Sequence, residues 1–198
     1  MTRGHRMASA YLCLAAVAAL PAAIGCSRDL GSAGDCQCPG AKPLVDPLLV
    51  AFLSKARAAH HVADQLEARG DVRGAASQLE TLLGGPKPGY PQLPAEVKEV
   101  LSDTHARLAD LLSRQSKFDA AEQHVRKGLK LSPDASYFRG HLFEVLGLVE
   151  ERRSSALAAR GERPLADKAR QRAIDAFEQA INIQDAVIRT AIDTDAAQ

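Results

Sequence analysis

Tryptophan is absent from this chain of 198 residues, and aromatic residues make up only 4% of it. Any core must therefore be built from alanine, leucine, valine and isoleucine. An excess of one charge is also lacking, because 25 basic and 24 acidic residues leave a formal net charge of +1. This balance argues against nucleic acid as a partner, since nucleic acids are bound by concentrated basic surfaces. The 14 glycines and 10 prolines are mostly clustered, which excludes collagen-like and wholly disordered chains.

Catalytic motifs are lacking as well. The chain contains no G-x-S-x-G, H-E-x-x-H, P-loop or dinucleotide-binding fingerprint. We therefore expect no enzyme activity, no cofactor, no bound metal and no small-molecule substrate.

The first 25 residues have the pattern of a secretory signal. A short basic start (Arg3 and Arg6, with no acidic residue) precedes an apolar stretch from Ala8 to Leu20. A membrane-spanning helix needs about 20 continuous apolar residues. Pro21 and Gly25 interrupt this segment, so a cleaved signal is the better interpretation.

Residues Ala23-Ile24-Gly25-Cys26 resemble a bacterial lipobox, although the usual first residue is leucine rather than Ala23. The resemblance implies that residues 1–25 are removed and that Cys26 becomes a lipidated N-terminus. Ser27 after the cysteine resembles the outer-membrane sorting pattern, which implies a lipoprotein of the cell envelope, anchored in the outer membrane and facing the periplasm. Residues 26–198 would then carry 23 basic and 24 acidic residues, so the lipid rather than charge would hold the protein at the membrane.

Residues 26–43 are rich in glycine, serine and proline and read as a flexible tether. This tether contains Cys36 and Cys38, which could pair with each other, although so small a ring is strained, or with another molecule. Together with His60 they could also form a metal- or thiol-responsive site. The simplest interpretation is that the two cysteines are exposed and have no chemical role. The disulfides and the metal- or thiol-responsive site remain open alternatives.

From Leu44 onward the strong helix formers alanine, leucine, glutamate, glutamine, arginine and lysine dominate. Apolar residues recur at intervals of three and four, and no stretch alternates with the period of a strand. Glycine and proline clusters interrupt this pattern at residues 70–71, 84–91, 132–133 and 161–164. The sequence therefore predicts an all-α fold of about six helices.

Three segments share one spacing of small and large apolar residues, and this spacing resembles the tetratricopeptide repeat. The matching positions are Ala59, Val62, Ala63, Leu66, Ala75, Leu79 and Leu82 in the first copy; His105, Leu108, Ala109, Leu112, Ala121, Val125, Gly128 and Pro133 in the second; and Phe143, Leu146, Gly147, Ala173, Phe177 and Ala180 in the third. The third copy holds fourteen extra residues between its halves, so we expect each of its helices to be about two turns longer. His105 occupies a core position of the pattern and is expected to be packed rather than reactive.

The resemblance implies a short α-solenoid of about three helical hairpins over residues 44–191, followed by a disordered tail at 192–198. In this family the first helices of the hairpins line a groove that binds peptides. The corresponding side chains are Arg57, His60, Asp64, Glu67, Asp103, Ala106, Asp110, Arg114, His141, Glu144, Leu148 and Glu151. Their acidic excess suits a neutral or basic partner. These charges could equally serve only to solvate the face, pairing along a helix as Asp110 and Arg114 can.

Together these patterns predict an envelope lipoprotein whose repeats form a scaffold for an unidentified envelope protein or peptide segment, accessory to assembly of an envelope complex. Two alternatives remain: the metal- or thiol-responsive lipoprotein and a structural lipoprotein that self-associates through its last helix. The apolar residues of that helix are Leu165, Ile174, Phe177, Ile181, Ile188 and Ala191.

Overall fold

The computed structural model describes residues 46–196. The expected signal, the lipobox with Cys26, and the tether with Cys36 and Cys38 lie outside the described residues. The described residues belong to one compact unit.

The described residues form six helices and no strand, which confirms the predicted all-α fold. The helices are α1 (Pro47–Ala68), α2 (Val72–Gly84), α3 (Ala95–Arg114), α4 (Phe118–Leu131), α5 (Tyr137–Ala159) and α6 (Arg163–Ala196). Each predicted break at a glycine or proline cluster separates two of them.

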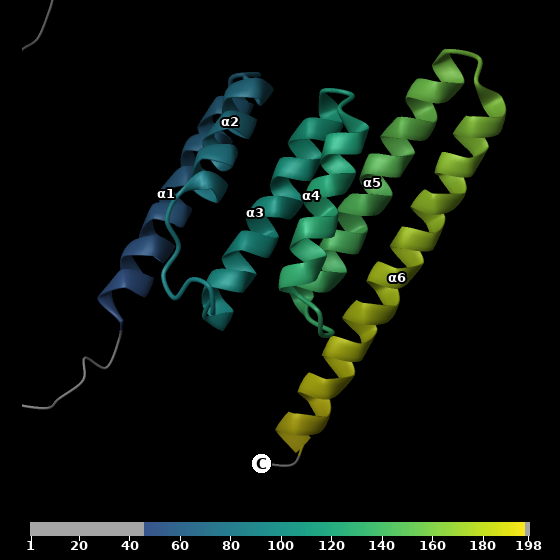
Figure 1. Cartoon of the computed structure of the whole chain (residues 1–198). Coiled ribbons are helices and arrows are strands. Elements are labelled where there is room, and N and C mark those ends of the chain that lie inside the picture. Colours follow the sequence, from purple (N-terminus) through teal and green to yellow (C-terminus); the bar gives the residue numbers. More distant parts are fainter. Residues whose placement is uncertain (1–45, 197–198) are drawn as a thin grey trace, which may run out of the picture. The chain divides into compact units, whose positions relative to one another are not determined.

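The helices pack as three consecutive hairpins, α1–α2, α3–α4 and α5–α6 (Figure 1). Helix α3 contacts both helices of the first hairpin, and α5 contacts both helices of the second. Among the described residues the first and third hairpins do not contact each other, and α6 packs on α5 alone. This nearest-neighbour stacking is the arrangement of a short α-solenoid.

The turns inside the three hairpins have the same backbone hydrogen bonds. Asp71 N donates to Leu66 O, Lys117 N to Leu112 O and Glu162 N to Leu157 O, at 2.9, 3.0 and 3.0 Å. Each turn also contains one residue with a positive φ: Gly70 (81°), Ser116 (60°) and Gly161 (80°). Glycine adopts this conformation without steric cost, whereas Ser116 adopts it in spite of its side chain. The repeat is thus visible in the backbone as well as in the sequence.

The third hairpin is longer than the other two, as its extra residues predicted. Glu162 of its turn follows Phe143 by 19 residues, whereas Asp71 and Lys117 follow Ala59 and His105 by 12. The difference of seven residues is about two helical turns. The second helix is extended equally, so Ala166 and Ala173, seven residues apart, are both buried.

The core is formed mainly by the residues of the repeat pattern. One cluster of buried residues, which includes Ala63, Leu79, Leu108 and Leu142, joins all three hairpins. A second cluster, which includes Phe52, lies between α1, α2 and α3. Val62 departs from the pattern, because 43% of its surface is exposed.

A close approach of α5 and α6 depends on a glycine of the repeat pattern. A Cβ atom on Gly147 would lie 2.6 Å from the ring of Phe177. Only a residue without a side chain allows the ring to rest against the α5 backbone here. This explains why the third copy has Gly147 where the first two copies, which have no aromatic residue at the position of Phe177, have alanine.

One expectation about the C-terminus was wrong. Residues 192–196 were expected to belong to a disordered tail, but α6 continues without a break to Ala196. The end of α6 extends past the start of α5 (Figure 1), and its last residues, 188–196, are exposed. No proline or glycine occurs between Leu165 and Ala196, so the sequence offers no residue that would end the helix earlier.

Candidate functional site

The first helices of the three hairpins, α1, α3 and α5, lie next to one another, with α3 in the middle. Most of the predicted groove residues lie on these helices at spacings of three and four. Such spacings place side chains on one face of a helix. The face shared by the three helices is therefore the candidate binding site.

A band of ion pairs crosses this face. Arg107 and Arg114 of α3 both reach back to Glu67 of α1, and Arg107 also pairs with Asp64. On the other side of α3, Arg152 of α5 donates to Asp110 with an Nη1–Oδ1 distance of 2.7 Å. We call these six residues the charged band: Asp64, Glu67, Arg107, Asp110, Arg114 and Arg152.

The charged band alters the ionisation of its own members. Burial disfavours the charged form of Glu67, but hydrogen bonds from Arg114 and Arg107 outweigh it and lower the pKa of this carboxyl. Burial also opposes the charge of Arg107, whereas Asp64 and Glu67 together raise its pKa. These contacts favour the charged forms of Glu67 and Arg107, and the ion pairs of the band link the three helices.

Two members of the charged band, Arg107 and Arg152, were not among the predicted groove residues. Within the band they balance the three carboxylates. The face as a whole keeps a smaller acidic excess, because Asp103, Glu144 and Glu151 outnumber Arg57 outside the band. The signal was present in the sequence, because Arg107 follows Asp103 by four residues and Arg152 follows Leu148 by four. The predicted pairing of Asp110 with Arg114 along α3 is confirmed at 3.8 Å.

Ala106 was also predicted to face the groove, and this prediction is wrong. Its side chain is fully buried in the core. Its neighbour Asp103 remains on the face, 3.9 Å from the ring of His60. On α5, His141 and Glu144 pair with each other at 3.2 Å. Arg57 and Glu151 are exposed, and Leu148 is half-buried.

His60 connects α1 to α3. The hydroxyl of Thr104 donates its proton to the carbonyl of Val100 at 2.7 Å, so the His60 Nε2, 2.9 Å from that hydroxyl, must be the donor. Burial lowers the pKa of His60, against the opposing charge of Asp103. A neutral imidazole that donates through Nε2 is thus part of the helix packing.

A pair of histidines lies between α3 and α4. The Nδ1 atoms of His105 and His124 are 2.9 Å apart, so one ring donates to the other. Burial, with the nearby charges of His124, Lys127 and Lys87, lowers the pKa of His105 to about 4. His105 is half-buried and packs against His124, as its place in the repeat pattern predicted.

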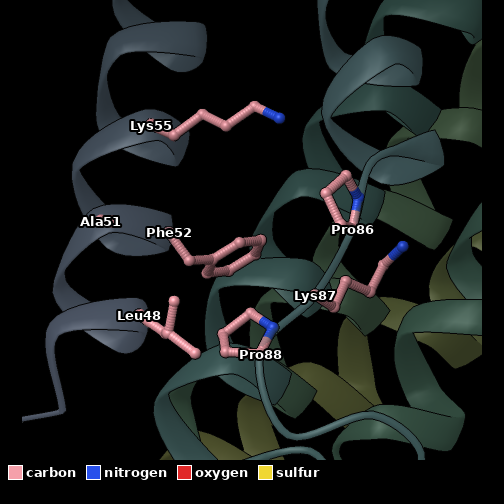
Figure 2. A pocket seen from close by; sticks show the side chains of 7 residues that line it. All are labelled: Leu48, Ala51, Phe52, Lys55, Pro86, Lys87 and Pro88. Atoms are coloured by element: carbon pink, nitrogen blue, oxygen red, sulfur yellow. The ribbon is translucent and has the colours of Figure 1, made fainter.

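An apolar hollow that sequence reasoning missed lies beside the start of α1. Figure 2 shows Leu48 and Phe52 of α1 facing Pro86 and Pro88 of the loop before α3. The hollow has a volume of about 330 Å³, enough for an apolar side chain. Lys87 holds the loop in place by donating to two carbonyl groups at the end of α2. The signal was the proline cluster at 86–91, which predicted a break between helices but not the hollow.

Metal binding has no support among residues 46–196, where no group of three or more histidine, cysteine, aspartate or glutamate side chains is arranged to hold an ion. Within the same range no helix is both long enough and apolar enough to cross a membrane. Comparison of the chain with models of protein families, with curated proteins and with solved structures found no match.

Proposed function

We propose that this chain is a lipoprotein of the bacterial envelope. Its helical hairpins, which resemble tetratricopeptide repeats, hold a segment of another envelope protein. In this proposal Cys26 carries the lipid and residues 26–43 form the tether. The protein faces the periplasm from the outer membrane and serves as an accessory scaffold. The lipobox resemblance and the composition of the tether support these parts.

The observation that carries the binding function is the charged band. Charges on a solvated helix face usually pair within one helix, and such pairs contribute little. Here the pairs connect different helices instead. Arg107 pairs with Glu67, 40 residues away, and Arg152 pairs with Asp110, 42 residues away. The band therefore fixes the spacing of α1, α3 and α5, which is what a preformed groove for an extended segment or a helix requires.

The band also defines the partner's chemistry. Its six charges cancel, so a strongly basic or acidic partner gains no net attraction from it. The groups next to the band that a partner can reach are Arg57, Asp103 beside His60, and the pair of His141 and Glu144. Acidic groups outnumber basic ones among them, so a neutral or weakly basic segment fits this face best.

The test compares two variants of the lipidated full-length protein, cross-linked in native membranes and analysed by mass spectrometry. The groove variant changes three exposed or half-buried side chains of the shared face to serine without touching the charged band: Arg57, Asp103 and His141. The control variant makes matched changes on second helices, which lie off this face: Arg73, Gln123 and Glu80. All six side chains are exposed or half-buried, so both variants should fold.

We expect discrete cross-linked partners that the groove variant loses and the control variant keeps. Equal capture by both variants would place binding elsewhere on the molecule and would contradict the groove. The thiol-responsive alternative has no support from the described residues. It would require zinc binding that disappears when Cys36 is changed to serine.

A further inference from the structure

Helix α6 carries a stripe of exposed isoleucines, and no other helix carries a comparable one among the described residues. Ile174, Ile181, Ile188 and Ile192 are 44, 60, 55 and 61% exposed. The first three follow one another at intervals of seven residues, which keeps them within about 20° of one face per interval. We call these four residues the isoleucine stripe. The buried face of α6 is different, consisting of Ala166, Ala169, Ala173, Ala176 and Ala180.

The isoleucine stripe borders the side of the last hairpin that has no neighbour. On α5, Leu142 and Val145 belong to the core shared with the earlier hairpins. Glu144, two residues after Leu142, points about 160° away from it around the helix. A largely apolar hollow of about 510 Å³ opens between Glu144 and Gly140 of α5 and Phe177 and Ile181 of α6. Each earlier hairpin is covered on its corresponding side by the next one, and this hairpin is not.

The charges of α6 are distributed unequally along its length. Residues 163–172 contain four basic side chains and one acidic one. Residues 185–196 contain three acidic side chains and one basic one. Two α6 helices side by side would bring opposite charges together if antiparallel and like charges together if parallel.

From these observations we infer that two copies of this chain associate through α6, antiparallel, with Ile181 at the two-fold axis. Ile181 is equidistant from Ile174 and Ile188, so an antiparallel pair centred on it places Ile174 of one copy opposite Ile188 of the other. Such an interface is self-complementary, as a two-fold dimer requires. The hollow next to Ile181 receives an apolar side chain of the second copy. This inference does not depend on the proposed function, because the charged band that carries that function lies on α1, α3 and α5 and includes no residue of α6.

The experiment uses residues 42–198, a compact unit whose core consists of its own residues. This unit contains no cysteine, since the four cysteines of the chain lie at positions 13, 26, 36 and 38. Molar mass is measured by light scattering for the unchanged unit and for an Ile181→Asp variant. Leu165→Asp is the matched control, because Leu165 is also exposed on α6 and lies roughly opposite Ile174 around the helix.

We expect the unchanged unit and Leu165→Asp to have twice the mass of one chain. Ile181→Asp should have the mass of one chain, with the same helical circular dichroism. A unit that is monomeric at every concentration would overturn the inference, and the stripe would then belong to a different partner. A dimer that survives Ile181→Asp would place the interface elsewhere and would overturn it as well.

Cysteine substitutions test the orientation. After mild oxidation, Ile181→Cys should form a disulfide-linked dimer. Ile174→Cys alone should not, but a mixture of Ile174→Cys and Ile188→Cys should give the mixed dimer. Efficient cross-linking of Ile174→Cys to itself, with no mixed dimer, would mean a parallel pair and would refute the antiparallel arrangement.

Discussion

The histidine pair between α3 and α4 should make the fold sensitive to mild acid. The pKa of His105 is lowered from 6.5 to about 4, chiefly by burial. Between these values the unfolded chain binds a proton at this position that the folded chain does not. Stability from this group is therefore complete above about pH 6.5 and is lost as the pH falls toward 4. Protonation of both rings would also place two N–H groups face to face where His105 and His124 share one hydrogen bond.

The magnitude follows from the same two values. At about pH 5 the pH lies about 1.5 units below the unfolded pKa of His105, so proton binding stabilises the unfolded state by about 2 kcal/mol relative to the folded state. Since His105 is only half-buried, solvent screening reduces this to about 1–2 kcal/mol. Burial lowers the pKa values of His60 and His124 as well, so they add to the loss in the same direction. The lowered pKa values of Glu67 and Glu122 act only at more acidic pH, below about 4.5, and leave this window to the histidines.

The assay is urea unfolding of residues 42–198 at about pH 7.5 and about pH 5, where the slope reports the exposed surface and the midpoint the stability. His105→Gln keeps a neutral polar group next to His124 and should lose about half or more of the pH effect. His61→Gln, an exposed position on α1, should keep all of it. If His105→Gln and the unchanged protein lose the same free energy between the two pH values, the reasoning about His105 is refuted.

Three further predictions concern packing, a buried charge and the anchor. Gly147→Ala should destabilise the fold by about 1–3 kcal/mol in urea unfolding, because its methyl group would overlap the ring packed there, whereas Gly84→Ala, with open space around it, should be neutral or mildly stabilising. Arg172→Met should cost about 1–3 kcal/mol, since it removes the closest partner, at 2.6 Å, of the buried Glu150 carboxylate, although Arg172 is half-exposed and Arg153 stays nearby. Changing Glu150 to methionine as well should restore most of the loss, and a double variant as unstable as the single one would contradict this. Cys26→Ser should release the full-length protein from the membrane fraction and abolish labelling with a palmitate analogue, while the same change at either tether cysteine should do neither.

Most of the fold could be predicted from the sequence, because glycine and proline mark most of the breaks between helices. The turn between α3 and α4 is the exception: Gln115, Ser116 and Lys117 contain neither residue, and Ser116 adopts a positive φ all the same. Composition alone would have joined the two helices. The eight-residue gap of the repeat pattern between Leu112 and Ala121 required a turn there, so the long-range regularity succeeded where local propensity gave no signal.

The candidate site was less predictable, for a physical reason. Helical spacing determines which side chains share a face, but it does not determine what those side chains meet. Arg107 and Asp64 are 43 residues apart, and nothing in either local sequence indicates that they pair. Groups that looked available for a partner were therefore already bound to another helix.

The same limit explains the most unusual position of the repeat pattern. Glu150 follows Phe143 by seven residues and so corresponds to Leu66 and Leu112 of the first two copies, yet it is only 2% exposed. Its carboxylate accepts two hydrogen bonds from Arg172 of α6 and lies 3.4 Å from Arg153. Glu150 is buried but Arg172 is half-exposed. Such a pair contributes little net stability compared with an apolar contact of the same size, but its directional hydrogen bonds favour one alignment of the two helices. In the lengthened third hairpin, where small alanines line the contact and leave few large side chains to fix the register of α6 on α5, a directional pair at Glu150 supplies that register.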